Sequence, residues 1–240
     1  MHSRRLVPEI MDGPDLPESQ HRRALTGLGK INRLSRTAQA LLAPVLELAQ
    51  TLGRRRLQLL DVASGAADVP LELALLTRRH GVDLDLTVLD KSAMALAVAQ
   101  ERSRRLGVEL RCLQGEVPGA APALTEPFDV VTCSLFLHHL PDGQVPGTLR
   151  WLGAHTRGLL LVSDLERSRT AYLLTWITVR LLTRSSVVHF DGPASVAAAF
   201  TGTELAQAAS EAGLEGATIQ RCWPKRLLLK WHPRMSPAAP

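Results

Sequence analysis

The chain has 240 residues, of which 45% are hydrophobic and 21% charged, and its formal net charge is +5. This length and balance predict one globular domain with a helical appendage and leave little room for a second full domain. The positive charge is scattered in short arginine groups, and only 4% of the residues are aromatic. We therefore expect a solvated basic surface and no nucleic-acid partner.

The sequence carries no signal for export, membrane insertion or metal binding. The N-terminal residues lack the apolar run of a signal peptide. The longest apolar stretch, 171–183, is interrupted by Arg180 and is shorter than the roughly 20 residues that span a bilayer. The three cysteines show no CxxC spacing and do not cluster with histidines, so no disulfide framework and no metal site are expected. A cytoplasmic monomer or homodimer is the simplest prediction.

The predicted elements begin with helices and continue as strands that alternate with helices. Residues 1–20 are typical of an extended, partly ordered leader, and helical spacing follows to about residue 51. We take residues 1–52 as a leader and helical lid. Strands are expected at 57–62, 84–89, 108–113, 128–134, 157–163, 216–222 and 226–231, and helices at about 68–80, 92–106, 143–153, 170–182 and 202–213.

This order of elements predicts the fold class. Alternating strands and helices favour an α/β fold with a Rossmann-like, doubly wound and mostly parallel sheet. The last two strands are joined by only three residues, 223–225, so they should pair antiparallel. We expect a seven-stranded sheet within residues 53–240, with an antiparallel C-terminal strand and a helical insertion at about 166–200.

Polar and small residues stand at successive strand ends, where open α/β sheets bind their ligands. After the first strand comes a small-residue turn in which Gly65 can adopt a positive φ. Asp90 follows the second strand, where an acid can accept hydrogen bonds from ribose hydroxyls. Glu116 follows the third, and its carboxylate can accept from an adenine amino group. A lone acid after a strand is more often a helix cap than a ligand-binding residue. The joint occurrence of these acids at successive strand ends predicts a nucleoside site.

The same residues resemble a known family. Asp61 and Gly65 match the acid and a glycine of the first loop of class I S-adenosylmethionine (SAM)-dependent methyltransferases. Ala63 and Ala67 stand where glycine is usual in that loop. An alanine held at a positive φ costs on the order of 1 kcal/mol.

A second stretch narrows the resemblance to small-molecule methyltransferases. Residues 128–140 are similar to the fourth-strand motif of that group and form the most specific match. The segments 163–169 and 189–193 resemble bacterial members related to quinone biosynthesis and often encoded beside type III polyketide synthases. The resemblance, strongest over 57–165, implies SAM as cofactor, S-adenosylhomocysteine (SAH) as product, and a phenolic, quinone-like or polyketide acceptor from secondary metabolism.

The strand ends and the resemblance together define the expected cofactor site. We expect SAM to contact the first loop and the residues that follow strands two to four. The expected cofactor-binding residues are Asp61, Ala63, Ser64, Gly65, Asp68, Asp90, Lys91, Gly115, Glu116, Cys133 and Ser134.

Methyl transfer from a sulfonium requires alignment of the acceptor and, for a hydroxyl, removal of its proton. His138 and His139 lie just beyond the fourth strand, and His189 lies in a loop expected after the long helix. Each is a candidate base near neutral pH, with helix capping or local packing as the alternative role. The expected acceptor-binding residues are Phe136, Arg167, Trp176 and Asp191.

Two other functions stay open. A nicotinamide-dependent oxidoreductase would share the strand-end acid, but the loop lacks G-x-G-x-x-G and no Tyr-x-x-x-Lys occurs. A non-catalytic SAM-fold binding protein is compatible with the two alanines in the loop. Residues 134–137 also lack the Asn/Asp-Pro-Pro-aromatic motif that is typical of nucleobase or amide N-methylation. This favours O- or C-methylation over N-methylation.

Overall fold

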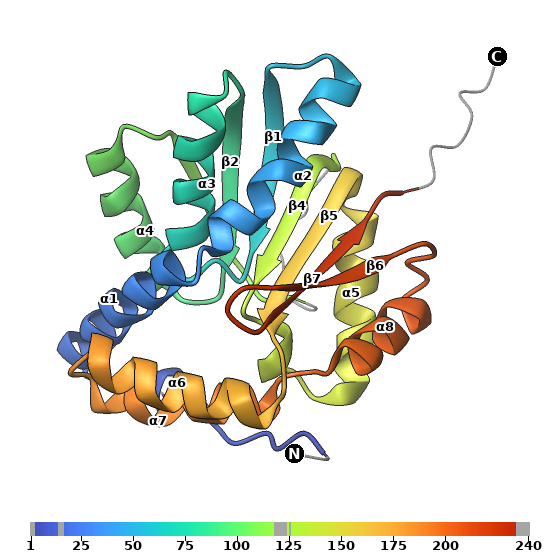
Figure 1. Ribbon diagram of the computed structural model, residues 1–240. Helices are drawn as coiled ribbons and strands as arrows, with labels where there is room; N and C mark the ends of the chain where they lie inside the picture. The colour runs from blue at the N-terminus through green and yellow to red at the C-terminus, as the bar shows by residue number, and fades with distance from the viewer. Residues whose placement is uncertain (1–2, 14–16, 118–123, 125, 234–240) are drawn as a thin grey trace.

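A computed structural model describes residues 3–13, 17–117, 124 and 126–233, so parts of the expected leader, residues 1–2 and 14–16, lie outside the described residues. Within these residues one sheet has the strand order β3-β2-β1-β4-β5-β7-β6 (Figure 1). The strands are β1 (Arg56–Val62), β2 (Asp83–Asp90), β3 (Leu110–Gln114), β4 (Phe128–Ser134), β5 (Thr156–Leu165), β6 (Thr218–Cys222) and β7 (Arg226–Trp231).

The strand directions confirm the predicted sheet. Strands β1 to β5 pair in parallel, and β7 pairs antiparallel with both β5 and β6. The strand order reverses between β1 and β4, which are hydrogen-bonded neighbours in the sheet. That reversal is the point at which open α/β sheets form their ligand crevice.

Helices cover both faces of the sheet because the side chains of each strand alternate. In β1, Leu57 and Leu59 pack in a core with α2, α3 and α4, whereas Leu60 and Val62 pack in a second core with α5 and α8. The helices are α1 (Glu18–Leu34), α2 (Thr37–Leu52), α3 (Asp68–Arg79), α4 (Ala93–Leu106), α5 (Val145–Ala154), α6 (Arg169–Leu182), α7 (Ser186–Ala198) and α8 (Gly202–Glu211), with 3-10 turns at Ile10–Asp12, Leu137–His139 and Asp142–Gln144.

A lid built from distant segments crosses the carboxyl edge of the strands (Figure 1). It consists of α1, α6, α7 and the leader residues 3–13. Ala24 of α1, Val179 of α6 and Val188 of α7 form one buried apolar cluster, against which Met11 of the leader packs. In contrast, α2 packs on the face of the sheet. Among the described residues, no helix combines the length and the apolar character needed to cross a membrane.

Helix α7 is absent from the sequence prediction, which expected a loop around residues 189–193. Gly192 and Pro193 are typical helix breakers, but tertiary packing overrides them here. A Cβ on Gly192 would lie 2.9 Å from a methyl carbon of Val179, so glycine lets α7 approach α6 closely. The hydroxyl of Ser185 also caps the helix by accepting from the backbone N–H of Val188 at 3.4 Å.

Candidate functional site

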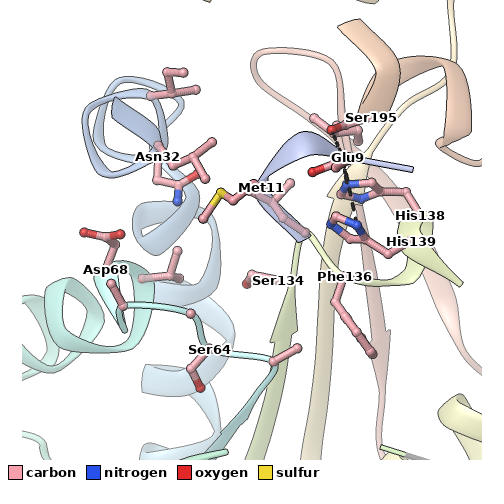
Figure 2. A pocket seen from close by; sticks show the side chains of 18 of the residues that line it. Glu9, Met11, Asn32, Ser64, Asp68, Ser134, Phe136, His138, His139 and Ser195 are labelled. Atoms are coloured by element: carbon pink, nitrogen blue, oxygen red, sulfur yellow. Dashed lines mark hydrogen bonds and ion pairs between the residues drawn. The ribbon is translucent and has the colours of Figure 1, made fainter. Parts of the chain in front are cut away.

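A cavity of about 1100 Å³ opens at the carboxyl ends of β1 to β4 and continues beneath the lid (Figure 2). Ser64 and Asp68 lie on one side of it, Phe136 and the His138–His139 pair lie on the other, and Ser134 lies between them. Small-molecule pockets typically measure about 300–1,000 Å³, so this cavity has room for two ligands. The expected cofactor-binding residues that line it are Asp61, Ala63, Ser64, Gly65, Asp68, Asp90, Lys91, Gly115, Glu116 and Ser134.

The loop after β1 holds three small residues in the left-handed backbone region. Ala63, Gly65 and Ala67 have φ values of 55°, 53° and 55°. The two alanines thus keep the conformation for which glycine is favoured, at a cost of about 1–2 kcal/mol each. The loop is held in place by the N–H of Ser64, which donates to the carbonyl of Leu89 at 3.2 Å.

Replacing Ala63 by glycine should therefore raise the free energy of unfolding by about 1 kcal/mol, because strain relief exceeds the added entropy of the unfolded chain. For a protein of this size the melting temperature should rise by about 2–4 °C. The matched control is Ala97→Gly on the exposed face of α4, which should lose about 1 kcal/mol. Equal losses in both variants would contradict the strained backbone at Ala63.

Asp90 at the end of β2 ties the loop to the sheet. Its two carboxylate oxygens accept hydrogen bonds from the backbone N–H of Gly65 at 2.7 Å and of Ser92 at 2.8 Å. A carboxylate can accept about four hydrogen bonds. Asp90 therefore keeps acceptor capacity at a position that lines the cavity.

Asp61 at the end of β1 is 2% exposed and lines the cavity. The hydroxyl of Thr132 donates to its carboxylate at 2.5 Å. Burial nevertheless raises the pKa of Asp61 to about 7. A cationic ligand group beside Asp61 would lower that pKa and favour the carboxylate.

Asp68 lies in the first turn of α3, where its charge complements the helix dipole. Burial raises the pKa of Asp68. The ion pair with Arg102 at 2.5 Å partly offsets this increase. A Cβ on Gly29 would lie 2.7 Å from the Asp68 carboxylate, so this glycine lets the lid helix α1 approach the site.

Cys133 and Ser134 occupy opposite faces of β4. The Cys133 side chain is fully buried in the core beneath α5 and α8 and does not line the cavity, which corrects its expected contact with SAM. The reason is the alternation of side chains along a strand. Ser134 lines the cavity, and among the described residues its buried hydroxyl has no hydrogen-bond partner. That hydroxyl is free to bind a ligand.

His138 forms a buried dyad with Asp164 at the end of β5. Its Nδ1 lies 2.6 Å from Asp164 Oδ1, and Asp164 also accepts from the N–H of Leu165 at 2.7 Å. Burial would raise the pKa of Asp164, but the His138 charge and these hydrogen bonds outweigh it and lower that pKa. The carboxylate thus places the proton on Nδ1, and Nε2 is left as the acceptor.

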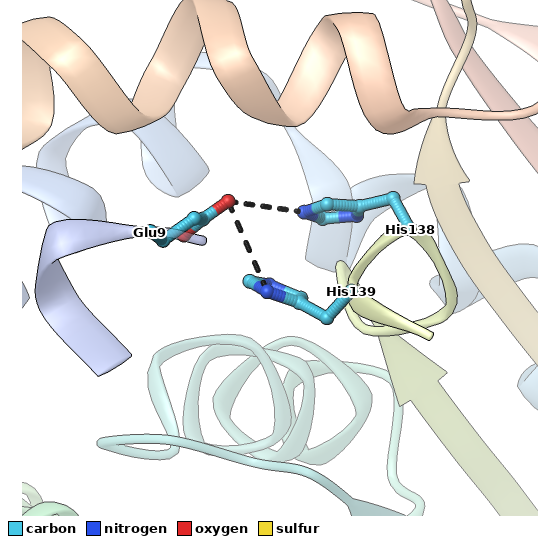
Figure 3. A group of neighbouring side chains, drawn as sticks. All are labelled: Glu9, His138 and His139. Carbon is cyan, nitrogen blue, oxygen red and sulfur yellow. Dashed lines mark ion pairs between the residues drawn. The ribbon is translucent and has the colours of Figure 1, made fainter. Parts of the chain in front are cut away.

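Glu9 of the leader reaches both histidines (Figure 3). Its Oε1 lies 3.9 Å from His138 Nε2 and 3.8 Å from His139 Nδ1, and it accepts from the hydroxyl of Ser195 at 2.5 Å. The ligand atoms of Glu9, His138 and His139 lie within 4.8 Å of one another, so the group has donors that could hold a divalent metal ion. The sequence did not lead us to expect this group, because Glu9 is far from the histidines along the chain.

Arg4 fixes the leader against the turn that carries the histidines. Its side chain pairs with Asp142, donates to the carbonyls of His138 at 3.2 Å and Leu140 at 3.0 Å, and stacks on Phe200 at 3.8 Å. Farther along, the carboxylate of Asp191 accepts from the N–H groups of Ile10 and Met11 at 2.8 and 3.0 Å. Asp191 therefore anchors the leader and does not line the cavity, contrary to its expected role in acceptor binding.

Three further expected site residues lie outside the cavity. His189 is in α7, and its Nε2 bonds with the carbonyl of Thr183 at 2.8 Å, so it is a structural residue and not a candidate base. Trp176 is 43% exposed on the outer face of α6 beneath the guanidinium of Arg180. For Trp176 the difference lies in the phase of the helix, since the neighbouring Thr175 lines the cavity. For His189 it lies in the element itself, because a helix replaces the expected loop and Val188 lines the cavity instead.

Arg167 is also engaged in structure. Its side chain is 1% exposed and forms two hydrogen bonds with the Glu204 carboxylate at 2.8 and 2.5 Å. It does not line the cavity, in which it was expected to bind the acceptor. A different arginine, Arg226 at the start of β7, does line it. Neither Arg226 nor Asp164 was predicted as a site residue.

Comparison with known proteins adds three findings. A family model described as a methyltransferase domain matches residues 59–157. Over 120 residues the chain is 31% identical to a ubiquinone biosynthesis O-methyltransferase of Pseudomonas putida, covering 50% of this chain and 49% of that protein. Over 179 residues it is 29% identical to the enzyme of the same name from Bordetella avium, covering 71% and 66%. The chain thus spans half to just under two thirds of these relatives.

A solved structure matches over a longer range. The magnesium protoporphyrin IX methyltransferase of Synechocystis PCC 6803, crystallised with bound SAH, aligns with a TM-score of 0.55 at 14% identity. The alignment covers 92% of this chain and 90% of that one. At this identity the likeness shows the fold alone.

Proposed function

We propose that the chain, in which a methyltransferase domain model matches residues 59–157, is a class I SAM-dependent enzyme that methylates a small acceptor on oxygen, with carbon as the second choice. The acceptor we propose is phenolic, quinone-like or a polyketide of secondary metabolism. The observation that carries this proposal is the single cavity that joins the strand-end loop to the His138–Asp164 dyad. SAM is the cofactor and SAH the product.

The cofactor half of the cavity suits SAM by its charge. Asp61, Asp90 and Glu116 line this half, and carboxylates there complement the sulfonium and ammonium groups of SAM. Asp90 would bind the ribose hydroxyls, and Glu116 the adenine amino group. The unpartnered hydroxyl of Ser134 would bind beside the reacting carbon.

The acceptor half supplies the base. When bound, SAM supplies an electrophilic methyl group, which the acceptor oxygen takes as the carbon–sulfur bond breaks and SAH leaves with the bonding electron pair. His138 Nε2 accepts the hydroxyl proton, and Asp164 stabilises the resulting imidazolium through Nδ1–H. His139 is the second candidate base. Phe136 and the apolar lid residues Leu28 and Val179 would pack against an aromatic acceptor.

O-methylation is further supported by the relatives, whose printed names specify O-methyl transfer in ubiquinone biosynthesis. The proposal also retains a cytoplasmic monomer or homodimer without a nucleic-acid partner. The free thiols Cys112, Cys133 and Cys222 are compatible with that compartment.

Isothermal titration of the folded protein with SAM and SAH tests the cofactor assignment, and failure of both to bind would refute the proposed function. Methyl transfer is then measured with labelled SAM on a panel of phenols and quinols. Transfer to panel members supports the enzyme. Cofactor binding without transfer to any of them would favour a non-catalytic SAM-binding protein, and NADH fluorescence on mixing would favour an oxidoreductase.

A further inference from the structure

Arg226 lines the cavity from β7. It is the first residue of β7 and lies opposite Leu165, the last residue of β5. A tight turn precedes it, closed by a hydrogen bond from the N–H of Lys225 to the carbonyl of Cys222 at 3.1 Å. The position of Arg226 at the cavity wall is therefore fixed by the sheet on one side and by the turn on the other.

The guanidinium of Arg226 is buried and incompletely bonded. The residue is 4% exposed, and Nη2 donates to the hydroxyl of Ser35 at 2.8 Å and to Asn32 Oδ1 at 3.5 Å. Among the described residues, Nη1 has no hydrogen-bond partner. Burial lowers the pKa of Arg226 to about 10, so the side chain remains charged at neutral pH.

No carboxylate of the described residues forms an ion pair with Arg226 within 4.0 Å, and Asp164, whose charge raises the pKa of Arg226, is bonded to His138 and to Leu165. A buried cation with an unfilled donor is costly unless a counter-charge or hydrogen-bond acceptor is supplied. Since Arg226 lines the cavity, a bound ligand can supply both.

We propose that Arg226 is the anion-binding residue of the acceptor site, which selects acceptors that carry a carboxylate besides the hydroxyl that is methylated. The planar guanidinium suits a carboxylate because both present paired, coplanar hydrogen-bonding atoms. Arg167 was expected to bind an acidic group of the acceptor, but its guanidinium is bonded to Glu204. We assign that role to Arg226 instead. This inference rests on the proposed function and adds an acidic acceptor class to it.

The carboxylate of SAM is a second source of the same chemistry. Arg226 on β7 lies four strand spacings from Asp90 on β2, or about 19 Å between backbones at about 4.8 Å per spacing. Most residues assigned to the cofactor follow β1, β2 and β3, with Ser134 at the end of β4, whereas Arg226 lies on β7 beyond β5. We assign the acceptor carboxylate as the partner of Arg226, and a titration with cofactor analogues tests the carboxylate of SAM.

The test uses the SAH-loaded full chain and matched ligand pairs. Hydroxybenzoates and hydroxycinnamates, such as 3,4-dihydroxybenzoate, are each compared with the corresponding neutral amide by isothermal titration. In the wild type the acid should bind about tenfold to a hundredfold more tightly than its amide, the range expected for a charge-assisted pair. In Arg226→Gln that ratio should fall to about one, and Arg226→Lys should retain part of it.

Asn32→Asp supplies a variant that keeps Arg226. It places a carboxylate where Asn32 Oδ1 already contacts Nη2, so the internal acid should compete with the ligand and lower the acid-to-amide ratio. If Arg226→Gln does not fold, this variant and Arg226→Lys decide. A wild-type ratio near one, absence of binding by every acid, or a ratio unchanged in the variants would overturn the inference.

A second titration, with cofactor analogues, distinguishes the carboxylate of the acceptor from that of SAM. It also distinguishes failure of this inference from failure of the proposed function. SAH and 5′-methylthioadenosine, which lacks the amino-acid carboxylate, are titrated into the wild type and Arg226→Gln. If Arg226→Gln bound SAH more weakly than the wild type but bound 5′-methylthioadenosine equally well, Arg226 would be assigned to the cofactor and the inference would be overturned. Failure of the wild type to bind SAH would instead refute the proposed function.

Discussion

Replacing His138 by asparagine is expected to slow methyl transfer by about 10²–10⁴-fold while SAM still binds, the usual loss when a general base is removed. The asparagine amide can occupy the place of Nδ1 and donate to Asp164, so the buried carboxylate keeps a partner. Only the acceptor atom Nε2 is lost. The measurement is single-turnover transfer from labelled SAM to the best phenol of the panel, as a function of pH.

The controls for His138→Asn separate chemistry from folding. His80→Asn changes an exposed histidine at the end of α3 and should leave the rate unchanged. Asp164→Asn should slow transfer as well, because it removes the charge that stabilises the imidazolium. His139 would be assigned as the base if His138→Asn transferred methyl within about threefold of the wild-type rate while His139→Gln slowed transfer by about 10²–10⁴-fold.

Replacing Asp90 by alanine should weaken SAM binding by about 100-fold or more, because hydrogen bonds to a charged group contribute about 1.5–3 kcal/mol each. Two effects add in this variant. The ribose loses its proposed acceptor, and the N–H of Gly65 loses the bond that holds the strained loop at the end of β2. Titration calorimetry with SAM and SAH measures the loss.

Two variants frame the result for Asp90. Asp90→Asn keeps one acceptor oxygen and should lose less affinity than alanine does. Asp85→Ala removes another acid of β2, one that pairs on the surface with Arg56, and should bind SAM normally. Unchanged SAM affinity in a folded Asp90→Ala protein would show that the ribose assignment is wrong.

The position of the residues assigned to the cofactor was predictable because it depends on local sequence. Asp61, Asp90 and Glu116 each lie at or just after the end of a strand, and the strands were recognisable from their apolar runs and small-residue turns. Parallel strands bring their carboxyl ends to one edge, so sequence order alone places these residues together. The strain at Ala63 was foreseeable as a cost, but the φ angle came only from the structure.

The acceptor half was not predictable because it depends on contacts between distant segments. Glu9 meets the histidines only when the leader docks on α7, and Arg226 reaches the cavity only because β7 inserts between β5 and β6. The expected positions of Trp176 and His189 at the cavity differ from the structure for another reason. Helical periodicity defines a helix without stating which face turns to the cavity, and the glycine in α7 concealed that helix altogether.

The lid is built from segments that lie outside the domain shared with known proteins. The matched domain, residues 59–157, contains the strand ends assigned to SAM, whereas Glu9, Arg226 and the helices α1, α6 and α7 lie outside it. Changes in those outer segments can reshape the acceptor chamber without altering the cofactor loop. Two proteins that share this domain can therefore share a methyl donor and still differ in the compound they modify.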